Sequence, residues 1–448
     1  MRFTETGTVP KAELAVISLG CDKNRVDTEN ALAYFADAGW GVTADLAGAD
    51  AILVNTCGFI DPAKRESIDA ILEAAAYKKT GRCRALIVSG CLSQRYKEQL
   101  KEGIPEIDVI AGTDRYADLP AAAERALAGE GLQLLSNDIN DRHFTNRRIL
   151  TTPAHYAYLK IAEGCSNRCT YCAIPYIRGN YTSRGEEELI KEAEFLVEGG
   201  VKELILVAQD VTRYGADRGE RRLIPLLEKL SALDLERIRL LYLYPEQVDD
   251  ELIEYIAKND KICKYVDIPL QHISDRILKR MGRRVNKESI LALMKKLRKR
   301  DIFVRSTFIV GFPGESEEEF EELLTFLKEA HLYACGFFAY SKEEGTPAAK
   351  LDGQLSARVK EARRKRAYAV QNALSAADKK ALAGKTFKVI YEDIDFDRQM
   401  FVGRTCFQTP EVDGVTYFTS ALPVQAGESY DVLITGAEGE DLIGEVRE

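Results

Sequence analysis

Short, mostly apolar runs alternate along the first part of the chain with longer stretches in which apolar residues recur every three or four positions. The runs are residues 15–21, 51–57 and 84–91, and the stretches between them are residues 25–39 and 61–79. Mostly apolar runs of this length favour buried strands, and the longer period favours amphipathic helices. Strand, helix and strand at this spacing predict βαβ units and hence a parallel sheet.

A second alternation of the same kind follows. Its strand-like runs are residues 156–164, 202–210, 237–245, 264–272, 303–315 and 333–341. Its helical stretches are residues 186–200, 222–233, 249–259, 286–300 and 316–331. Repeated strand–helix units of this kind predict a partial (βα)6 barrel that is open on one side.

Two helices carry additional local signals. The helix at 61–79 opens with Asp61 and Pro62, which predicts an aspartate N-cap followed by proline at the first helical position. A long connecting helix is predicted at residues 356–385. Its basic run at residues 363–366 is expected to form a solvated face.

The pattern changes once more near the C-terminus. From Gly384 onward, five short strands separated by glycine and Asp-Gly turns predict a small antiparallel β-barrel of the oligonucleotide-binding type. The chain is therefore predicted to be an α/β protein of four parts. They are a parallel-sheet domain at residues 11–130, a barrel at 151–355, a connecting helix at 356–383 and a terminal barrel at 384–448.

Composition narrows the class of protein. Of the 448 residues, 30% are charged and 46% are hydrophobic, as in ordinary globular proteins. No apolar run approaches the roughly 18–20 residues that cross a bilayer, and the first residues lack the apolar core of a secretory signal. We therefore expect a cytoplasmic protein with no membrane partner. Ten cysteines in such a compartment indicate metal ligation or catalysis wherever they cluster.

Charge argues against the partner that the terminal barrel would otherwise predict. The fold type favours RNA, but the residues from Gly384 onward include 13 acidic and 5 basic side chains, a difference of −8, against −9 for the whole chain. Such a surface repels phosphate and favours a cationic partner. The terminal barrel is therefore predicted to bind a basic protein.

Three cysteines follow the three strands of the first domain. Cys21, Cys57 and Cys91 each end an apolar run, so a parallel sheet delivers all three to one edge. Thiolate-rich sites suit zinc or iron–sulfur clusters, and three ligands leave a coordination position open. Zinc with three cysteines and a water stays an alternative here. Cys83 precedes the strand that Cys91 follows, so we expect it about 25 Å away at the opposite end.

A second and more specific group follows the first strand of the barrel. Cys165, Cys169 and Cys172 form a C-x3-C-x2-C pattern on the loop after residues 156–164. A zinc ribbon would need a further ligand pair, and none follows at a usable distance. A 4Fe–4S cluster held by three thiolates would leave one iron free to bind a small molecule. The remaining cysteines, Cys263, Cys335 and Cys406, are isolated and expected to be structural.

Active residues of such barrels lie at the carboxyl ends of the strands. That edge offers Gln209, Asp210, Tyr244, Gln271, His272, residues 311–315 and residues 340–344. His272 is expected to be a satisfied hydrogen-bonding residue, and His143 and His155 are expected at the surface or in packing. Gly311 and Gly314, on either side of Pro313, predict a tight turn whose backbone could approach a nucleoside.

The C-x3-C-x2-C spacing resembles the radical S-adenosylmethionine (SAM) superfamily, and Tyr171 occupies the aromatic position of its motif. The order of the three domains resembles the methylthiotransferases, from about Leu14 to the C-terminus. The matching stretches are SLGCDKNRVDTE, NTCGFIDPAKRESID, AYLKIAEGCSNRCTYCAIPYIRG, DIPLQHIS, STFIVGFPGE and YSKEEGTPAAKL.

This resemblance implies a radical SAM barrel, a terminal TRAM domain and two 4Fe–4S clusters. Cys165, Cys169 and Cys172 would hold the cluster that cleaves SAM to a 5′-deoxyadenosyl radical. Cys21, Cys57 and Cys91 would hold an auxiliary cluster that carries the transferred sulfur. The SAM contacts that we assign are Tyr171, Gln209, Asp210 and Gly311. The two clusters would have to share one substrate, so the sheet edge of the first domain should face the barrel mouth.

The residues within these stretches resemble those of one branch of the family. That branch methylthiolates the β-carbon of an aspartate in the small-subunit ribosomal protein S-twelve. The implied partners are that basic protein, bound through the acidic TRAM domain, and an electron donor such as flavodoxin or ferredoxin. The transfer-RNA branch differs after the first and second cysteines and in its basic terminal domain. Methylthiolation of a modified adenosine in transfer RNA is the alternative, and a non-catalytic iron–sulfur sensor is a third hypothesis.

Overall fold

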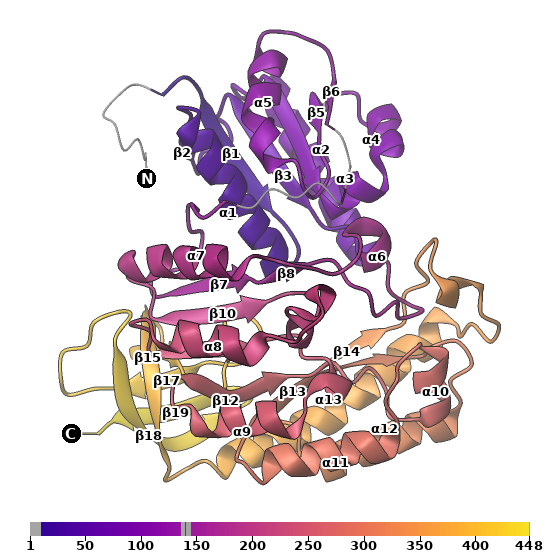
Figure 1. Ribbon diagram of the computed structural model, residues 1–448, viewed down its shortest axis with the longest axis vertical. Coiled ribbons are helices and arrows are strands. Elements are labelled where there is room, and N and C mark those ends of the chain that lie inside the picture. The colour runs from indigo at the N-terminus through magenta and orange to yellow at the C-terminus, as the bar shows by residue number, and fades with distance from the viewer. Residues whose placement is uncertain (1–9, 136–138, 140–144, 448) are drawn as a thin grey trace.

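The computed structural model describes residues 10–135, 139 and 145–447 and places three units one after another along the chain (Figure 1). The N-terminal unit lies at one end of the molecule. The central sheet follows it, and the C-terminal barrel lies beside the ends of the central strands, at the left of the view. Among the described residues, no helix is long and apolar enough to cross a membrane.

The N-terminal unit is a parallel sheet, as predicted. Its strands are β1 Glu13–Ser18, β2 Gly41–Thr43, β3 Ala51–Thr56, β4 Ala85–Gly90, β5 Val109–Ile110 and β6 Gln133–Leu134, in the order β2-β1-β3-β4-β5-β6. Its helices are α1 Asp22–Asp37, α2 Asp61–Thr80, α3 Cys91–Arg95, α4 Lys97–Gly103 and α5 Leu119–Leu127. Strands β3 and β4 are buried along their whole length, because helices cover both faces of a parallel sheet.

The start of α2 differs from the prediction. Ile60 occupies the N-cap position, and Asp61 is the first helical residue. The backbone N–H of Asp61 donates to Glu343 Oε1 at 2.9 Å, and its carboxylate pairs with Lys64 at 2.5 Å. The aspartate cap was therefore wrong: the helix begins one residue earlier, where the Ile60 carbonyl accepts from the Lys64 N–H at 3.0 Å, and a carboxylate of the central domain satisfies the free N–H of Asp61 at the helix start.

The central unit is the predicted partial barrel. Its strands are β7 Tyr156–Lys160, β10 Glu203–Val207, β11 Arg237–Leu240, β12 Ile262–Asp267, β13 Phe303–Val310 and β14 Ala334–Ala339, all parallel, in the order β14-β13-β12-β11-β10-β7. The main helices are α7 Glu186–Glu198, α8 Leu223–Ser231, α9 Asp250–Lys258, α11 Lys287–Arg298 and α12 Glu317–Ala330, with shorter α6 Ile174–Ile177 and α10 Asp275–Arg280. A two-stranded ribbon, β8 Ala162–Glu163 with β9 Thr182–Ser183, accompanies them. Strands β7 and β14 form the two edges, so the barrel does not close.

The C-terminal unit is a closed five-stranded barrel. Its strands are β15 Thr386–Asp395, β16 Met400–Arg404, β17 Thr416–Thr419, β18 Ser429–Glu438 and β19 Asp441–Val446. The predicted barrel is confirmed, and its strands pair antiparallel except that β17 and β19 run parallel. Helix α13 Ala357–Lys380 connects it to the central sheet, as predicted.

The basic run in α13 is only partly solvated. Arg363 is buried, and its guanidinium pairs with Glu315 at 2.6 Å and with Glu317 at 3.0 Å. Arg366 also pairs with Glu317, at 2.6 Å. The expectation of a solvated face was therefore wrong for Arg363, because α13 lies against the acidic start of α12 and that guanidinium faces the contact.

The C-terminal barrel covers the inner face of the central sheet at the amino ends of its strands. Phe407 stacks on Phe303, the first residue of β13, with ring centroids 4.2 Å apart. Glu203, the first residue of β10, pairs with Arg239 at 2.7 Å and with Arg404 of β16 at 2.9 Å. All three ionic side chains are buried. One end of the partial barrel is thereby closed, and chemistry is confined to the carboxyl ends of the strands.

The pKa of Glu203 reflects the ion pairs that hold the C-terminal barrel against the central sheet. Burial alone would raise that pKa, but Arg239 and Arg404 lower it well below its ordinary value of 4.5. The lowered pKa means that the ionised carboxylate stabilises the folded chain above that ordinary value. This stabilisation is lost progressively as the pH falls below it.

Replacing Glu203 with glutamine tests this closure. Glu203→Gln leaves buried Arg239 without its carboxylate, so we expect the free energy of unfolding at pH 7 to fall by about 3–5 kcal/mol. The difference from the wild type should shrink below about pH 4.5, where the wild type loses the same contribution. Urea midpoints at both pH values measure the effect, with exposed Glu228→Gln as the control. Equal midpoints for wild type and Glu203→Gln at pH 7 would contradict it.

Candidate active site

The structure brings the first three cysteines together at the carboxyl edge of the N-terminal sheet. Cys21 caps α1, Cys57 directly follows β3, and Cys91 is the first residue of α3. Burial, then the neighbouring Cys91, raises the pKa of Cys57 to about 12, with a smaller contribution from Cys21. At Gly20, whose φ is +91°, a Cβ would lie 3.2 Å from Cys57 Sγ. Glycine at position 20 therefore allows the backbone after β1 to approach the thiol of Cys57.

Cys83 does not join this group. It lies before β4, whose other end leads to Cys91, and its thiol donates to the carbonyl of Ala85 at 3.5 Å. Cys83 is buried, whereas Cys21 is exposed and Cys57 is half-buried. The prediction that Cys83 belongs to the opposite end of the sheet is confirmed.

The second three cysteines lie on the loop between β8 and α6. Burial, then Cys169, raises the pKa of Cys172, and burial raises that of Cys165 to about 11. Tyr244 Oη lies 3.5 Å from Cys169 Sγ, and Arg283 Nη1 lies 4.0 Å from it. Two polar groups, one from the segment after β11 and one from the segment after α10, thus face the middle cysteine of the loop.

Hydrogen bonds to the barrel hold this cysteine loop in place. Asn167 donates to Asp210 Oδ2 at 2.8 Å and accepts from Arg213 at 3.2 Å. On the other side, Thr170 N–H donates to the Met281 carbonyl at 2.9 Å, and Thr170 Oγ1 donates to the Arg280 carbonyl at 2.8 Å. The loop is therefore anchored on two sides of the barrel mouth.

The side chains expected to contact SAM divide into two kinds. Tyr171 packs beside the buried Met281 and Phe312, and burial holds its pKa well above its usual value. Gln209 donates to Glu163 Oε1 at 2.6 Å, while its Oε1 is buried with no hydrogen-bond partner among the described residues. Both oxygens of Asp210 accept hydrogen bonds, one of them from Asn167 in the cysteine loop. Gln209 thus has a free acceptor, whereas Asp210 holds the loop.

Packing against α13 explains why glycine stands at position 311. Its φ is +72°, and a Cβ there would lie 2.5 Å from Lys360 Cγ of α13. Its N–H donates to Glu315 Oε2 at 2.7 Å. The backbone at this turn is covered by α13, so a contact between Gly311 and a nucleoside stays a prediction.

The histidines follow the expectations only in part. His272 is buried, and its Nδ1 accepts a hydrogen bond from the Ser274 N–H at 3.0 Å. Its Nε2 is buried with no hydrogen-bond partner among the described residues, so the expectation of a fully satisfied side chain was wrong. His155 is buried and lies 2.8 Å from Glu392 in the C-terminal barrel. His143 lies outside the described residues.

The two cysteine groups are in contact through packed side chains of α3 and the segment around α6. Cys91 packs against Ala173 and Ile177, and Ala173 directly follows Cys172. Helices α3 and α6 lie side by side where the N-terminal unit meets the central sheet (Figure 1). The edge of the first sheet therefore faces the mouth of the partial barrel.

Arg178, at the end of α6, bonds to residues of both domains. Its Nε donates to Cys91 Sγ at 3.3 Å, and its Nη2 donates to Asn24 Oδ1 at 2.7 Å. Its Nη1 donates to Asp27 at 2.9 Å and to Glu163 at 2.8 Å. Only 2% of its surface is exposed. Burial opposes the charged form, yet Cys91, Glu163 and Asp27 hold the pKa of Arg178 well above its usual value.

Lys160 completes a charge-balanced group that we call the buried quartet: Asp27, Lys160, Glu163 and Arg178. Lys160 bonds to Asp27 and, at 2.8 Å, to Glu163. Two cations and two carboxylates cancel, which is the condition for burying ions without a large cost. One member comes from α1, which begins beside Cys21, and three come from segments that flank the second cysteine loop. Sequence reasoning missed the quartet, although Arg178 stands within a quoted motif.

A second contact between the domains lies on the loop after β14. Glu343 is 1% exposed and accepts from Asp61 N–H at 2.9 Å, from Lys64 at 3.0 Å and from Arg95 at 3.1 Å. Arg95 also donates to the Gly58 carbonyl at 3.1 Å. The chain just after Cys57 and the helix that begins at Cys91 are thereby tied to the barrel. Sequence reasoning placed Glu343 at the barrel edge, within residues 340–344, but did not predict this contact between the domains.

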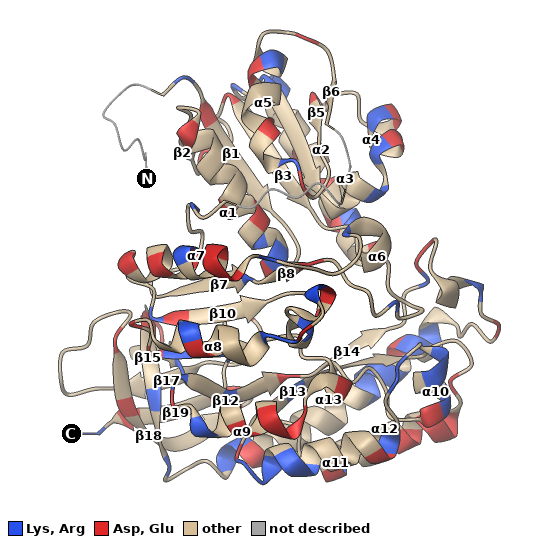
Figure 2. Ribbon diagram, viewed as in Figure 1, with Lys and Arg blue, Asp and Glu red and all other residues tan. Residues whose placement is uncertain are grey.

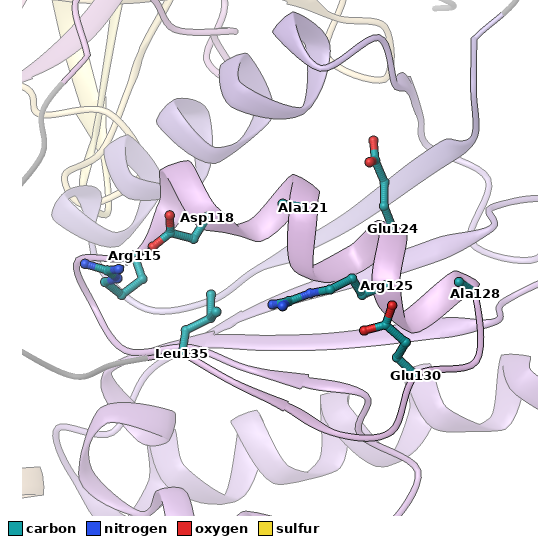
Figure 3. A pocket seen from close by; sticks show the side chains of 8 residues that line it. All are labelled: Arg115, Asp118, Ala121, Glu124, Arg125, Ala128, Glu130 and Leu135. Atoms are coloured by element: carbon teal, nitrogen blue, oxygen red, sulfur yellow. Dashed lines mark ion pairs between the residues drawn. The ribbon is translucent and has the colours of Figure 1, made fainter.

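A hollow on the N-terminal domain lies away from this arrangement. It is lined by Arg115, Asp118, Ala121, Glu124, Arg125, Ala128, Glu130 and Leu135 (Figure 3). These residues belong to α5 and the segments on either side of it, and none is a predicted site residue. Arg115 and Asp118 pair with each other at 2.7 Å. The hollow therefore adds nothing to the candidate site.

Family models match three parts of the chain. The Radical SAM superfamily matches residues 159–327, the Uncharacterized protein family UPF0004 matches residues 13–112, and the TRAM domain matches residues 383–446. The three matches follow one another in the order of the three folded units.

Curated relatives are similar over nearly the whole chain. Proteins named ribosomal protein uS12 methylthiotransferase RimO are 45% identical in Acetivibrio thermocellus and 46% identical in Clostridium tetani. Each alignment covers 97% of this chain and 98% of the relative. Among solved structures, the radical SAM methyltransferase TsrM from Kitasatospora setae aligns with a TM-score of 0.57 at 15% identity. That alignment covers 76% of this chain and 77% of TsrM, and it shows a shared fold.

A double-mutant cycle tests the buried quartet. Arg178→Gln alone leaves two carboxylates against one cation, so we expect about 3–5 kcal/mol of lost stability. Adding Asp27→Asn restores the charge balance, so the double variant should be more stable than the sum of the single losses by about 1–3 kcal/mol. Urea unfolding of the four proteins measures this coupling. Strictly additive losses would show that the charges act independently.

Proposed function

Because the chain belongs to the RimO family of radical SAM methylthiotransferases, we propose that it adds a methylthio group to the β-carbon of an aspartate in ribosomal protein uS12. One observation carries the proposal. The two three-cysteine groups are joined by the packing of Cys91 on Ala173 and Ile177, at the mouth of a barrel whose other end is closed. The enzyme class follows from the family. The substrate aspartate, the two clusters and the partner surfaces belong to this proposal.

The two sets of side chains fit iron–sulfur clusters. Each consists of three thiols, and thiolate is the ligand that such clusters prefer. Among the described residues, no three histidine, cysteine or carboxylate side chains form a group that would hold a single metal ion. We assign Cys165, Cys169 and Cys172 to the cluster that binds SAM. We assign Cys21, Cys57 and Cys91 to the auxiliary cluster.

A 4Fe–4S cluster held at the second group would supply the electron for cleavage of SAM, and one held at the first group would supply the site from which sulfur is transferred. The protein's own residues orient and enclose this chemistry. Arg283 and Tyr244 face Cys169 with polar hydrogens, and Tyr171 beside them helps to exclude water. We assign SAM contacts to Tyr171 and Gln209, whose Oε1 has no partner among the described residues, and also to Asp210 and Gly311.

The C-terminal barrel offers a surface for a basic protein. Several of its carboxylates are used within the molecule: Glu392, Glu411, Asp413, Glu438 and Glu440 all pair with arginine or lysine. Five others are exposed and form no ion pair among the described residues: Asp393, Asp397, Glu428, Asp431 and Glu445. We assign uS12 binding to this acidic surface and electron supply to an acidic donor such as flavodoxin or ferredoxin, in the cytoplasm.

Serine substitutions separate the two cysteine groups. Cys165→Ser should abolish SAM cleavage, whereas Cys57→Ser should still release 5′-deoxyadenosine but transfer no methylthio group. Each variant should lose about four iron atoms per chain after reconstitution. Cys83→Ser, another cysteine of the first domain, is the control and should keep both activities. The readouts are chromatography of 5′-deoxyadenosine, mass spectrometry of uS12 and iron content. Loss of SAM cleavage in Cys57→Ser would contradict the division of roles.

Neutralising the acidic surface tests the substrate. Glu428→Gln, Asp431→Asn and Glu445→Gln together should weaken uS12 binding roughly tenfold at low salt and flatten its salt dependence, because each exposed ion pair contributes little alone. Binding is measured by titration calorimetry with purified uS12. The control combines Glu194→Gln, Glu228→Gln and Glu251→Gln, three exposed carboxylates of the central domain. Label from SAM that appears in transfer RNA instead of uS12 would overturn the choice of substrate.

A further inference from the structure

Four cations lie in or beside the second cysteine loop. We call them the basic rim: Arg168, Lys279, Arg280 and Arg284. Arg168 lies inside the cysteine loop, and the other three lie at the end of α10 and just beyond it. None of the four forms an ion pair among the described residues, although most arginines elsewhere in the central domain do. Arg168, Lys279 and Arg284 are exposed.

Backbone contacts hold the rim against the loop. Thr170, next to Cys169, bonds to the carbonyls of Arg280 and Met281, as described above. A Cβ built at Gly282 would lie 3.5 Å from the side chain of Thr170 and 3.7 Å from the Arg168 carbonyl. These are ordinary van der Waals distances, so the end of α10 packs closely against the loop, and a side chain at position 282 would be strained by the φ of +74°. The rim and the loop with its three thiols form one continuous piece of surface.

Nearby acidic groups offset the charge of the rim only in part. The Glu246 carboxylate lies close enough to Arg284 to interact with its charge, but the two form no ion pair among the described residues. Glu319 pairs with Arg276 at 2.5 Å, and Asp275 accepts the Lys287 N–H at 2.6 Å. Arg280 Nη2 donates to the Asp352 carbonyl, a neutral acceptor, at 3.3 Å. In a chain of net charge −9, a group of neighbouring cations that form no ion pair among the described residues is unusual. Exposed charges of one sign contribute little to stability, but they attract a partner of the opposite sign.

We propose that the basic rim is the docking surface for a small, acidic, one-electron carrier protein. The inference rests on the proposed function, since only a reducible centre at the neighbouring thiols requires such a partner. The donor is oxidised by one electron, and the centre at the thiols is reduced by one. That electron then enters the sulfonium of SAM, where a C–S bond breaks to give methionine and the 5′-deoxyadenosyl radical. Redox encounters of this kind use small, charge-steered interfaces.

The rim and the acidic surface attract opposite partners to different places. Figure 2 shows α10 and the C-terminal barrel at opposite sides of the molecule. A basic protein is drawn toward the barrel and repelled from the rim, and an acidic donor experiences the reverse. Both partners can therefore be bound at once.

Nucleic acid is the other acidic macromolecule that a basic rim could attract. Proteins that grip a phosphate backbone typically make about 6–10 phosphate contacts, more than four cations provide. The chain as a whole is acidic, which opposes further phosphate contacts. The observations therefore favour a protein donor, and RNA binding becomes an outcome of the test.

The experiment compares two reductants. A double variant, Lys279→Glu with Arg284→Glu, is assayed for 5′-deoxyadenosine with reduced flavodoxin or with dithionite. We expect the KM for flavodoxin to rise about tenfold or more and its salt dependence to weaken. The dithionite-driven rate should stay close to that of the wild type, because a small reductant needs no docking surface. The matched control is Lys295→Glu with Lys299→Glu, two exposed cations at the end of α11 with no ion pair among the described residues.

Binding is measured separately, so the inference does not depend on turnover. Titration calorimetry should show flavodoxin bound by the wild type and by the control variant, and bound weakly by the rim variant. Unchanged binding and unchanged KM in the rim variant would overturn the proposal. Equal losses with both reductants, or loss of RNA binding with flavodoxin binding intact, would also overturn it. Failure of the wild type to cleave SAM with dithionite would instead count against the proposed function.

Discussion

The buried quartet is the interaction on which the arrangement of the two cysteine groups depends. Its two cations and two carboxylates come from α1 of the first domain and from the segments that flank the second cysteine loop. Arg178, a member of the quartet, also donates to the thiol of Cys91. Separating the domains would leave charges buried without partners or force them to be solvated anew, so the edge of the sheet stays against the barrel mouth. Glu343 provides a second fixed point beyond Cys57.

The partial barrel is open at the carboxyl ends of its strands, because the C-terminal barrel covers the amino ends. Phe407 and Arg404 of the C-terminal barrel fill the inner face at the amino ends of the strands, where aromatic stacking and the pairing of Arg404 with Glu203 hold them. This packing occupies part of the surface of the C-terminal barrel within the molecule. Part of its acidity is used in internal ion pairs, and the exposed remainder gives that side of the molecule its negative sign.

Local patterns predicted most of the fold. Mostly apolar runs and helical periods located β1, β3 and β4 of the first sheet and all six strands of the second, because a sheet covered on both faces requires such runs. The patterns missed β2, β5 and β6, which are only two or three residues long. Two further errors concern charged side chains. Asp61 is not an N-cap because the helix already begins at that residue, with its N–H bound by Glu343, and Arg363 is not solvated because Glu315 lies against it. Helix-capping and charge-run rules consider only neighbours along the chain, so they could not include either contact.

The sequence by itself determined which thiols are available and at which strand ends they stand, since spacing and strand direction are local properties. It also determined the acidic character of the terminal barrel. Only the tertiary structure decided that Cys91 would lie against the residue after Cys172, and that Arg178 would reach a thiol of the other domain. It likewise placed the basic rim, whose four cations form no ion pair among the described residues, beside the second cysteine loop. The physical reason is that burial and charge pairing are set by segments far apart in the chain, and these segments meet only when the domains pack.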